Sequence, residues 1–160
     1  MLLKNNNMTQ YIGTLVFFIE DKKLYFLVPY NSKKELEIPL RIKTDEETTR
    51  ECALKSIPSS LKIKEEDIEY RKSEEKDTKK KIQISINQRD KNGNQRTYFL
   101  AELKTEEGKK SHNPQEYLII EIENDFAMSL LPKKTKDLLI RISKKPIICP
   151  NTEKQQKSSD

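Results

Sequence analysis

The sequence predicts a single α/β domain, and three observations support this prediction. The chain of 160 residues is long enough to build one hydrophobic core. Short runs of β-branched and aromatic residues, bounded by polar turns, occur along its length. Other stretches carry helix caps and helically spaced apolar residues. We expect a flexible N-terminus over residues 1–8, the domain over residues 9–145, and a polar, disordered tail over residues 146–160.

The first third of the chain is expected to fold as a β-hairpin followed by a helix. The β-rich runs of the hairpin are residues 11–19 and 24–29. A helix is expected over residues 44–57, because Thr44 or Asp45 can cap its start and acidic residues fill its first turn. Pro58 is expected to end this helix, since proline inside a helix costs about 3 kcal/mol.

The rest of the chain is expected to supply further strands and two helices. The expected strands are residues 68–71, 81–88, 97–103 and 117–122, and the expected loops are residues 73–81 and 104–114. Ile82, Ile84 and Ile86 alternate with polar residues, as in a half-buried strand. Gly93 suits the hairpin turn that follows, and Asn124 can cap a short helix. The last helix is expected over residues 134–143, with a buried face made of Leu138, Leu139 and Ile142.

Composition argues against a membrane-spanning or disulfide-stapled protein. Charged residues make up 36% of the chain, and the mean hydropathy is −0.86. The longest apolar run, residues 14–19, has the length of a strand, and the N-terminus lacks the apolar region of a secretory signal. Cys52 and Cys149 form no close pair with each other or with His112, so neither a zinc site nor a disulfide is expected. We therefore expect a cytoplasmic protein that does not contact a membrane.

Positive charge is concentrated in two segments. Residues 71–96 contain nine Lys and Arg against four Asp and Glu, and residues 133–160 contain eight against three. This distribution favours contact with a polyanion such as RNA. The alternative is a mixed solvated surface in a chain whose lysine content reflects an AT-rich genome. No feature points to specific DNA binding. The candidate RNA-contact residues are Lys79, Lys80, Lys81, Arg89, Lys91, Arg96, Lys133, Lys134, Lys144 and Lys145.

Residues 36–63, LEIPLRIKTDEETTRECALKSIPSSLKI, have the layout of a known motif. They resemble the Nudix box, G-x(5)-E-x(7)-R-E-U-x-E-E-x-G-U, in which U is a bulky apolar residue. On that frame Arg41 falls on the opening glycine and Glu47 on the first glutamate. Lys62 replaces the closing glycine, and Ile63 keeps the last apolar site.

The metal-binding core of that motif is not kept. Lys55 replaces the arginine, and Ser56, Ser59 and Ser60 replace the three core glutamates. The family uses these carboxylates to hold Mg²⁺, which neutralises phosphate oxygens and activates water. Serine hydroxyls are neutral and weaker ligands. The resemblance therefore predicts a lost Mg²⁺ site, no cofactor, no catalytic residue at these positions, and a chain that is not an enzyme.

Within the family, the chain is similar to the diadenosine tetraphosphate hydrolase branch. That branch reads approximately W-x-x-P-K-G-H, Y-W-L-A-E and S-H-E-x-x-x-Y, and the counterparts here are residues 36–42, residues 98–102, and Ser111-His112 followed by Glu116-Tyr117. The lysine of the first motif is replaced by Leu40. The resemblance covers residues 9–145 and implies an α/β/α sandwich around a mixed sheet.

The resemblance also suggests three nucleotide-binding candidates, which are Tyr98, His112 and Tyr117. Tyr98 could stack on an adenine, but a tyrosine in an apolar strand is more often part of the core. His112 could contact phosphate, but alone in a polar loop it is more often a surface residue.

Two functions from different classes follow. The first is a catalytically inactive Nudix-fold pseudoenzyme that associates with RNA or a ribonucleoprotein such as the ribosome and keeps a nucleotide-binding cleft. The alternative is a residual hydrolase, or a sensor, of diadenosine polyphosphates. A residual hydrolase would use Glu47, Glu51 and Glu102 to hold a relocated metal.

Overall fold

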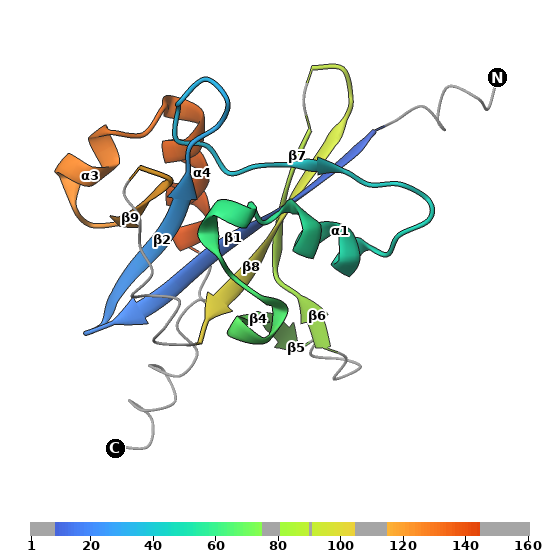
Figure 1. Cartoon of the computed structure of the whole chain (residues 1–160), viewed down its shortest axis with the longest axis horizontal. Coiled ribbons are helices and arrows are strands. Elements are labelled where there is room, and N and C mark those ends of the chain that lie inside the picture. Colours follow the sequence, from blue (N-terminus) through green and yellow to red (C-terminus); the bar gives the residue numbers. More distant parts are fainter. Residues whose placement is uncertain (1–8, 75–80, 90, 105–114, 145–160) are drawn as a thin grey trace.

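The computed structural model describes residues 9–74, 81–89, 91–104 and 115–144. The strands are β1 (Gln10–Glu20), β2 (Lys23–Pro29), β3 (Arg41–Ile42), β4 (Ile68–Tyr70), β5 (Lys72–Glu74), β6 (Lys81–Gln83), β7 (Ser85–Arg89), β8 (Gln95–Leu103) and β9 (Tyr117–Glu121). The helices are α1 (Thr49–Ser56), α3 (Asp125–Ser129) and α4 (Lys133–Ser143), with 3-10 turns η2 (Ser59–Leu61) and η3 (Glu65–Asp67). Figure 1 shows α1 and the α3–α4 pair on different sides of the long strands β1, β2 and β8.

The main sheet is mixed, as predicted. Its strand order is β4-β8-β1-β2-β9, with β3 beside β1 and β7 beside β8. β1 and β8 run parallel over residues 10–17 of β1, whereas β1 and β2 form the predicted antiparallel hairpin. The parallel pair is possible because a long connection containing α1 returns the chain to the far side of β1.

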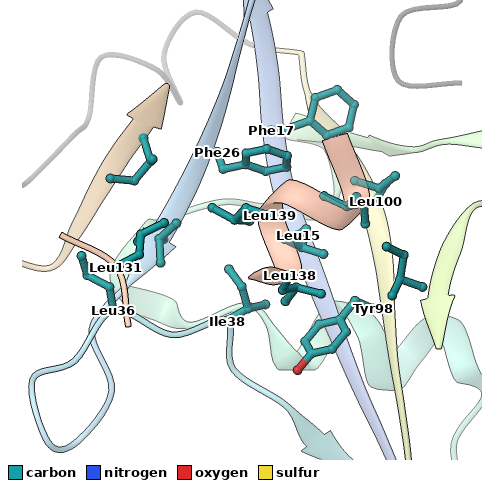
Figure 2. Close-up of a cluster of buried hydrophobic side chains, with 14 of the residues drawn as sticks. Leu15, Phe17, Phe26, Leu36, Ile38, Tyr98, Leu100, Leu131, Leu138 and Leu139 are labelled. Carbon is teal, nitrogen blue, oxygen red and sulfur yellow. The ribbon is translucent and has the colours of Figure 1, made fainter. Parts of the chain in front are cut away.

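Side chains alternate between two hydrophobic clusters, one on each face of the sheet. Along β1, Leu15 and Phe17 point to the cluster that contains Leu139 of α4, and Figure 2 shows these residues around α4. Val16 points to the opposite cluster, which contains Cys52 of α1. This alternation follows from the two-residue period of a strand. It places a helix on each face and confirms the expected α/β/α sandwich.

Helix α1 begins later than predicted. Thr48, rather than Thr44 or Asp45, is its N-cap, and the Thr48 hydroxyl accepts from the backbone N–H of Glu51 at 3.1 Å. The Glu51 carboxylate in turn accepts from the backbone N–H of Thr48 at 2.8 Å. This reciprocal capping box satisfies two backbone donors. Thr44 also has a glutamate three residues later, and Glu47 accepts from the Thr44 N–H at 3.3 Å, but the helix begins only after Thr48. The helix ends at Ser56, before Pro58, as predicted.

The stretch predicted as one strand over residues 81–88 is divided into β6 and β7 at Ile84. β6 pairs with β5, which occupies part of the predicted loop, and β7 pairs with β8. Ile84 lies where the partner changes, because its N–H donates to Arg71 and its carbonyl accepts from Leu100. Gly93 has φ of 83°, as its predicted turn requires.

The C-terminal helices agree with the prediction. The Asn124 side chain accepts from the N–H of Ala127 at 3.0 Å and caps α3. Leu138, Leu139 and Ile142 of α4 are at most 4% exposed. Within the described ranges, no helix is long and apolar enough to cross a membrane. The predictions for residues 1–8 and 146–160 lie outside the described residues, and the cytoplasmic location stays a prediction.

Candidate nucleotide cleft

The backbone of the box segment keeps the turn that the motif requires. Lys62 adopts φ 55° and ψ 39°, the left-handed conformation that favours glycine. This is the position at which the motif has its closing glycine. Leu61, one residue earlier, is 2% exposed and packs into the α1-side cluster. The local geometry therefore supports the frame on which the sequence was aligned.

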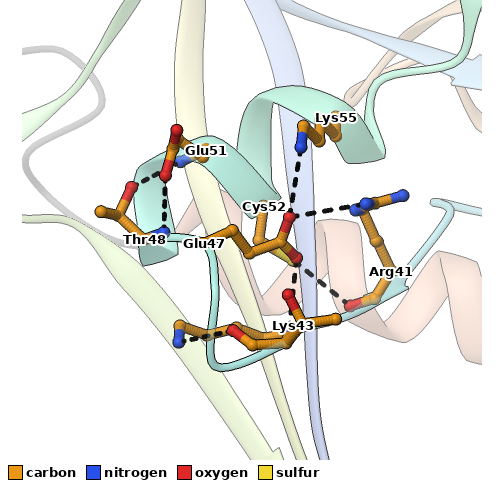
Figure 3. Close-up of polar contacts among 8 residues, drawn as sticks. Arg41, Lys43, Glu47, Thr48, Glu51, Cys52 and Lys55 are labelled. Atoms are coloured by element: carbon orange, nitrogen blue, oxygen red, sulfur yellow. Dashed lines mark hydrogen bonds and ion pairs between the residues drawn. The ribbon is translucent and has the colours of Figure 1, made fainter.

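Glu47 is the box carboxylate that remains, and protein groups surround it (Figure 3). Glu47 is 8% exposed. One carboxylate oxygen lies 3.4 Å from Arg41 Nη2 and 3.5 Å from Lys55 Nζ, and the other accepts from the N–H of Thr44 at 3.3 Å. Burial opposes ionisation, but the Thr44 N–H and the other contacts outweigh it and lower the pKa of Glu47.

The other box residues also have structural partners. Glu51 serves the capping box, and the backbone N–H of Thr48 lowers the pKa of Glu51. Ser56, at the first lost glutamate, is 7% exposed, and its hydroxyl donates to the carbonyl of Ala53 at 2.6 Å. Ser59 and Ser60 lie in the short turn η2. These side chains therefore do not form a set of oxygen ligands for a metal ion on one face of α1.

A divalent cation fits this donor set poorly. Among the described residues, no three His, Cys, Asp or Glu side chains are grouped where they could hold a metal ion. Glu102, the third ligand of the alternative hypothesis, pairs with Arg71 at 3.3 Å. Mg²⁺ needs several oxygen ligands in octahedral geometry. A carboxylate already engaged by two cations is a weak ligand for a third, so the residues present do not fit a divalent metal ion.

A cleft opens on the other face of the sheet, and we call it the Tyr98 cleft. Its volume is about 300 Å³. Its walls come from the loop before β3, from β7 and β8, and from the N-terminal half of α4. The lining residues are Glu37, Ile38, Leu40, Gln88, Arg96, Tyr98, Lys134, Thr135, Asp137 and Leu138.

Gly13 allows the loop before β3 to lie close to this cleft. A Cβ at Gly13 would stand 2.7 Å from the carbonyl oxygen of Pro39 and 3.2 Å from the Tyr98 ring. No side chain fits in that space. The loop therefore crosses directly over β1, and Leu40 is held beside Tyr98 in the wall of the cleft. These two residues come from the first and second motifs of the resemblance.

The Tyr98 side chain packs in the core and borders the cleft at one edge. It is 6% exposed and belongs to the α4-side cluster, and in Figure 2 its hydroxyl points away from Leu138 and Leu139. Burial raises the pKa of Tyr98, Arg96 acts against this, and Glu37 adds to it. The hydroxyl therefore stays protonated and lies within the field of two opposite charges that line the same cleft.

The fold brings the two basic segments of the sequence together at this cleft. Arg96, from the first segment, and Lys134, from the second, line the same cavity. Farther along α4, Arg141 Nη2 donates to the carbonyl of Asn87 in β7 at 3.4 Å. The sequence shows two separate positive segments, and the structure places parts of both on one face.

The candidate residues are distributed unevenly. Tyr117 is fully buried in the α1-side cluster, away from the Tyr98 cleft. Arg89, Lys91, Lys133, Lys134 and Lys144 are exposed, and Arg96 is half-buried. His112, Lys79, Lys80, Lys145 and the side chain of Lys81 lie outside the described residues. These roles stay predictions.

Sequence analysis missed the acidic residues of the cleft. Glu37 comes from the loop before β3, and Asp137 lies one turn after Lys134 on α4. The spacing of Lys134 and Asp137 places both on one helix face and could have suggested a pair. Glu37 gives no such signal, because its neighbours in the cleft are distant in sequence.

No family model matches the chain, and no curated protein matches it in sequence. Solved structures do match it. The Ap4A (diadenosine tetraphosphate) hydrolase of C. elegans aligns with a TM-score of 0.59 at 15% identity, covering 85% of this chain and 96% of that chain. The Nudix hydrolase RenU of M. smegmatis aligns with a TM-score of 0.56 at 13% identity, covering 86% and 88%. A mutT/nudix family protein from Listeria innocua aligns with a TM-score of 0.54 at 12% identity, covering 84% and 90%.

These comparisons correct one prediction. From the sequence we predicted that the chain is not an enzyme. The comparisons contradict this prediction, because the structures that share the fold over nearly the whole chain are hydrolases. The TM-scores of 0.59 and 0.56 establish a shared architecture, and the identities of 15% and 13% leave substrate and activity to be tested. The predicted resemblance is confirmed: this chain has the Nudix fold, and an Ap4A hydrolase is among the structures it resembles.

Proposed function

We propose that this chain is a hydrolase of dinucleoside polyphosphates and that it binds its substrate in the Tyr98 cleft. The observation that carries the proposal is the cleft itself. It combines an apolar wall with one cation from β8 and one from α4, in a fold shared with an Ap4A hydrolase. Small-molecule sites usually combine apolar walls with a few polar groups, and about 300 Å³ is the lower end of their size range.

The cleft offers different partners to the two ends of a nucleotide. Ile38, Leu40 and Leu138 provide apolar contact for a base or ribose. Arg96 and Lys134 provide positive charge for the phosphate chain. Arginine suits phosphate especially well, because its planar fork donates two parallel hydrogen bonds. A cleft of about 300 Å³ takes only part of a dinucleoside polyphosphate.

Hydrolysis in this cleft needs an attacking water and stabilised phosphate charge. The water oxygen forms a bond to one phosphorus, the bridging P–O bond on the far side breaks, and the leaving phosphate takes the electron pair. Glu37 and Asp137 are the carboxylates that line the cleft, and in this proposal one of them accepts the proton of the water. Arg96 and Lys134 oppose the charge that develops on the phosphate oxygens.

The expected rate is low. Metal ions supply several kcal/mol of transition-state stabilisation, and each 1.4 kcal/mol is worth about tenfold in rate. Because the residues present do not fit a metal cage, we expect turnover to be orders of magnitude slower than at a site that holds metal ions.

The test is direct. Purified chain is incubated with diadenosine tetraphosphate, and mononucleotide products are quantified by chromatography over hours. We expect products to accumulate in proportion to protein, and Lys134→Gln to reduce them about tenfold or more. Lys136→Gln is the matched control, because Lys136 is exposed on the same helix and lies outside the cleft. Nucleotide binding without any product would instead favour a sensor and would overturn the hydrolase.

A second candidate function, contact with RNA or a ribonucleoprotein such as the ribosome, is supported by the meeting of the two basic segments. The Arg141–Asn87 contact joins α4 to β7, and Arg89 and Lys144 are exposed on these two elements. Phosphate contacts by lysine and arginine make binding fall steeply with salt. Co-sedimentation with ribosomes or bulk RNA over a salt series tests this candidate, and association that does not respond to salt would contradict it.

A further inference from the structure

We infer that this chain holds the phosphate chain of its nucleotide with protein cations alone and needs no divalent metal for binding. This inference rests on the proposed function and deepens it, because it names what replaces the metal. It is drawn from the engaged carboxylates of the box and from the cations of the Tyr98 cleft.

The first step concerns the carboxylates. Glu47 would have to give up contacts with Arg41, Lys55 and the Thr44 N–H before its oxygens could turn to a metal ion. Each of these contacts is a charge-assisted hydrogen bond or an ion pair, and the residue is buried. A metal would therefore compete with two positive charges for one oxygen and with the Thr44 N–H for the other.

The second step concerns the remaining box positions. Glu51 closes the capping box of α1, so withdrawing its carboxylate would leave the Thr48 N–H without this acceptor. Ser56 is buried and donates to Ala53. A neutral hydroxyl that already donates to a carbonyl adds little to the binding of a divalent ion. Glu51 and Ser56 therefore serve the structure of α1.

The third step concerns charge at the cleft. Lys134 and Arg96 contribute two positive charges to its wall, and Glu37 and Asp137 contribute two negative charges. Asp137 also lies 3.9 Å from Lys133, whose side chain is 87% exposed. These four charges cancel, and Lys133, which lies outside the lining, offsets the charge of Asp137. An incoming polyphosphate would meet Lys134, an exposed charge-assisted donor in the wall of the cleft.

The experiment measures binding of a non-hydrolysable methylene-bridged analogue of diadenosine tetraphosphate by calorimetry. Titrations are run in excess EDTA and in excess Mg²⁺. We expect the two Kd values to agree within about twofold. Lys134→Gln should raise Kd about tenfold in both buffers, Lys134→Arg should restore it, and Lys136→Gln should leave it near the wild-type value.

The outcomes separate this inference from the proposed function. If the analogue binds only with Mg²⁺ while the wild-type chain still turns over substrate, the inference is overturned and the hydrolase stands. If binding is equal in both buffers but Lys134→Gln has no effect, the assigned cations are wrong and the inference is overturned. If the analogue binds in neither buffer and no product forms, both proposals fail. Thermal unfolding of each variant confirms that a lost signal does not come from an unfolded protein.

Discussion

The box cluster, which we define as Glu47 with Arg41 and Lys55, and the Tyr98 cleft both combine carboxylates with cations, yet the two arrangements differ in what their charges face. In the box cluster, Arg41 and Lys55 point at Glu47. In the cleft, Lys134 is exposed and lies in the wall of a cavity. The comparison teaches that a charge satisfied within the protein stabilises the fold, whereas an exposed charge that borders a cavity can meet a ligand.

The largest expected effect concerns the packing beneath α4, the helix that forms one wall of the Tyr98 cleft. Leu139 is fully buried between α4 and the sheet. Truncating it leaves a cavity beneath the helix that carries Lys134, so Leu139→Ala should lower the free energy of unfolding by about 2–5 kcal/mol. Urea unfolding followed by circular dichroism measures this. The control is Leu130→Ala, since Leu130 is 48% exposed, and its cost should be about 0.5 kcal/mol or less. Equal costs would contradict the assigned core.

A smaller effect tests whether the charge of Glu47 in the box cluster stabilises the fold. Because the folded protein lowers the pKa of Glu47, its carboxylate stabilises the fold fully above the ordinary glutamate pKa, about 4.3. That stabilisation is lost as the pH falls through the lowered pKa. Glu47→Gln should therefore unfold at a lower temperature than wild type near neutral pH.

The difference should shrink as the pH approaches the lowered pKa. Thermal unfolding of both chains across the acid range measures it. A difference that stays constant with pH would mean that the charge of Glu47 does not stabilise the fold. The box cluster would then not be an example of charge that stabilises the protein. Glu46→Gln is the control, because Glu46 is exposed in the same loop.

Much of the fold was predictable because the decisive signals are local. The hairpin over β1 and β2, the Asn124 cap and the apolar face of α4 each depend on residues within one or two turns of chain. The start of α1 was not written locally, because Thr44 and Thr48 each have a glutamate three residues later, Glu47 and Glu51. We predicted the earlier start, whereas the structure forms the reciprocal capping bonds at Thr48 and sets the Glu47 carboxylate against Arg41 and Lys55.

The break at Ile84 and the composition of the cleft were not predictable in the same way. Ile84 continues the alternation of its strand, and only its bonds to Arg71 and Leu100 reveal the change of partner. Glu37 and Lys134 are almost a hundred residues apart, and their segments meet where the Thr135 hydroxyl donates to the carbonyl of Leu36 at 2.8 Å. Local propensity carries no information about such contacts.

A third prediction distinguishes the two possible starts of α1. Thr48→Ala removes the hydroxyl of the capping box and should cost about 1 kcal/mol of stability. Thr44→Ala should cost clearly less, because Thr44 lies outside the helix. Chemical unfolding of the two variants in parallel gives the answer. If Thr44→Ala were the more damaging change, the helix would begin where the sequence alone suggested.

The smallest expected effect concerns Lys62, and its sign is opposite to the others. A left-handed conformation costs a non-glycine residue roughly 1–2 kcal/mol, and Lys62 adopts it with φ 55°. Lys62→Gly removes that cost but adds conformational freedom to the unfolded chain, worth about 0.5–1 kcal/mol. We therefore expect a net gain of a few tenths to about 1 kcal/mol in the free energy of unfolding.

The matched control is Lys64→Gly, since Lys64 has φ −100° and gains no relief from glycine. It should lose stability where Lys62→Gly gains it. The sign of the difference matters more than its size. A gain at residue 62 alone would mean that the box turn retains the backbone shape of its motif under a strained lysine. Equal losses at both positions would mean that the turn is relaxed around lysine, and the structural argument for the Nudix frame at this residue would be withdrawn.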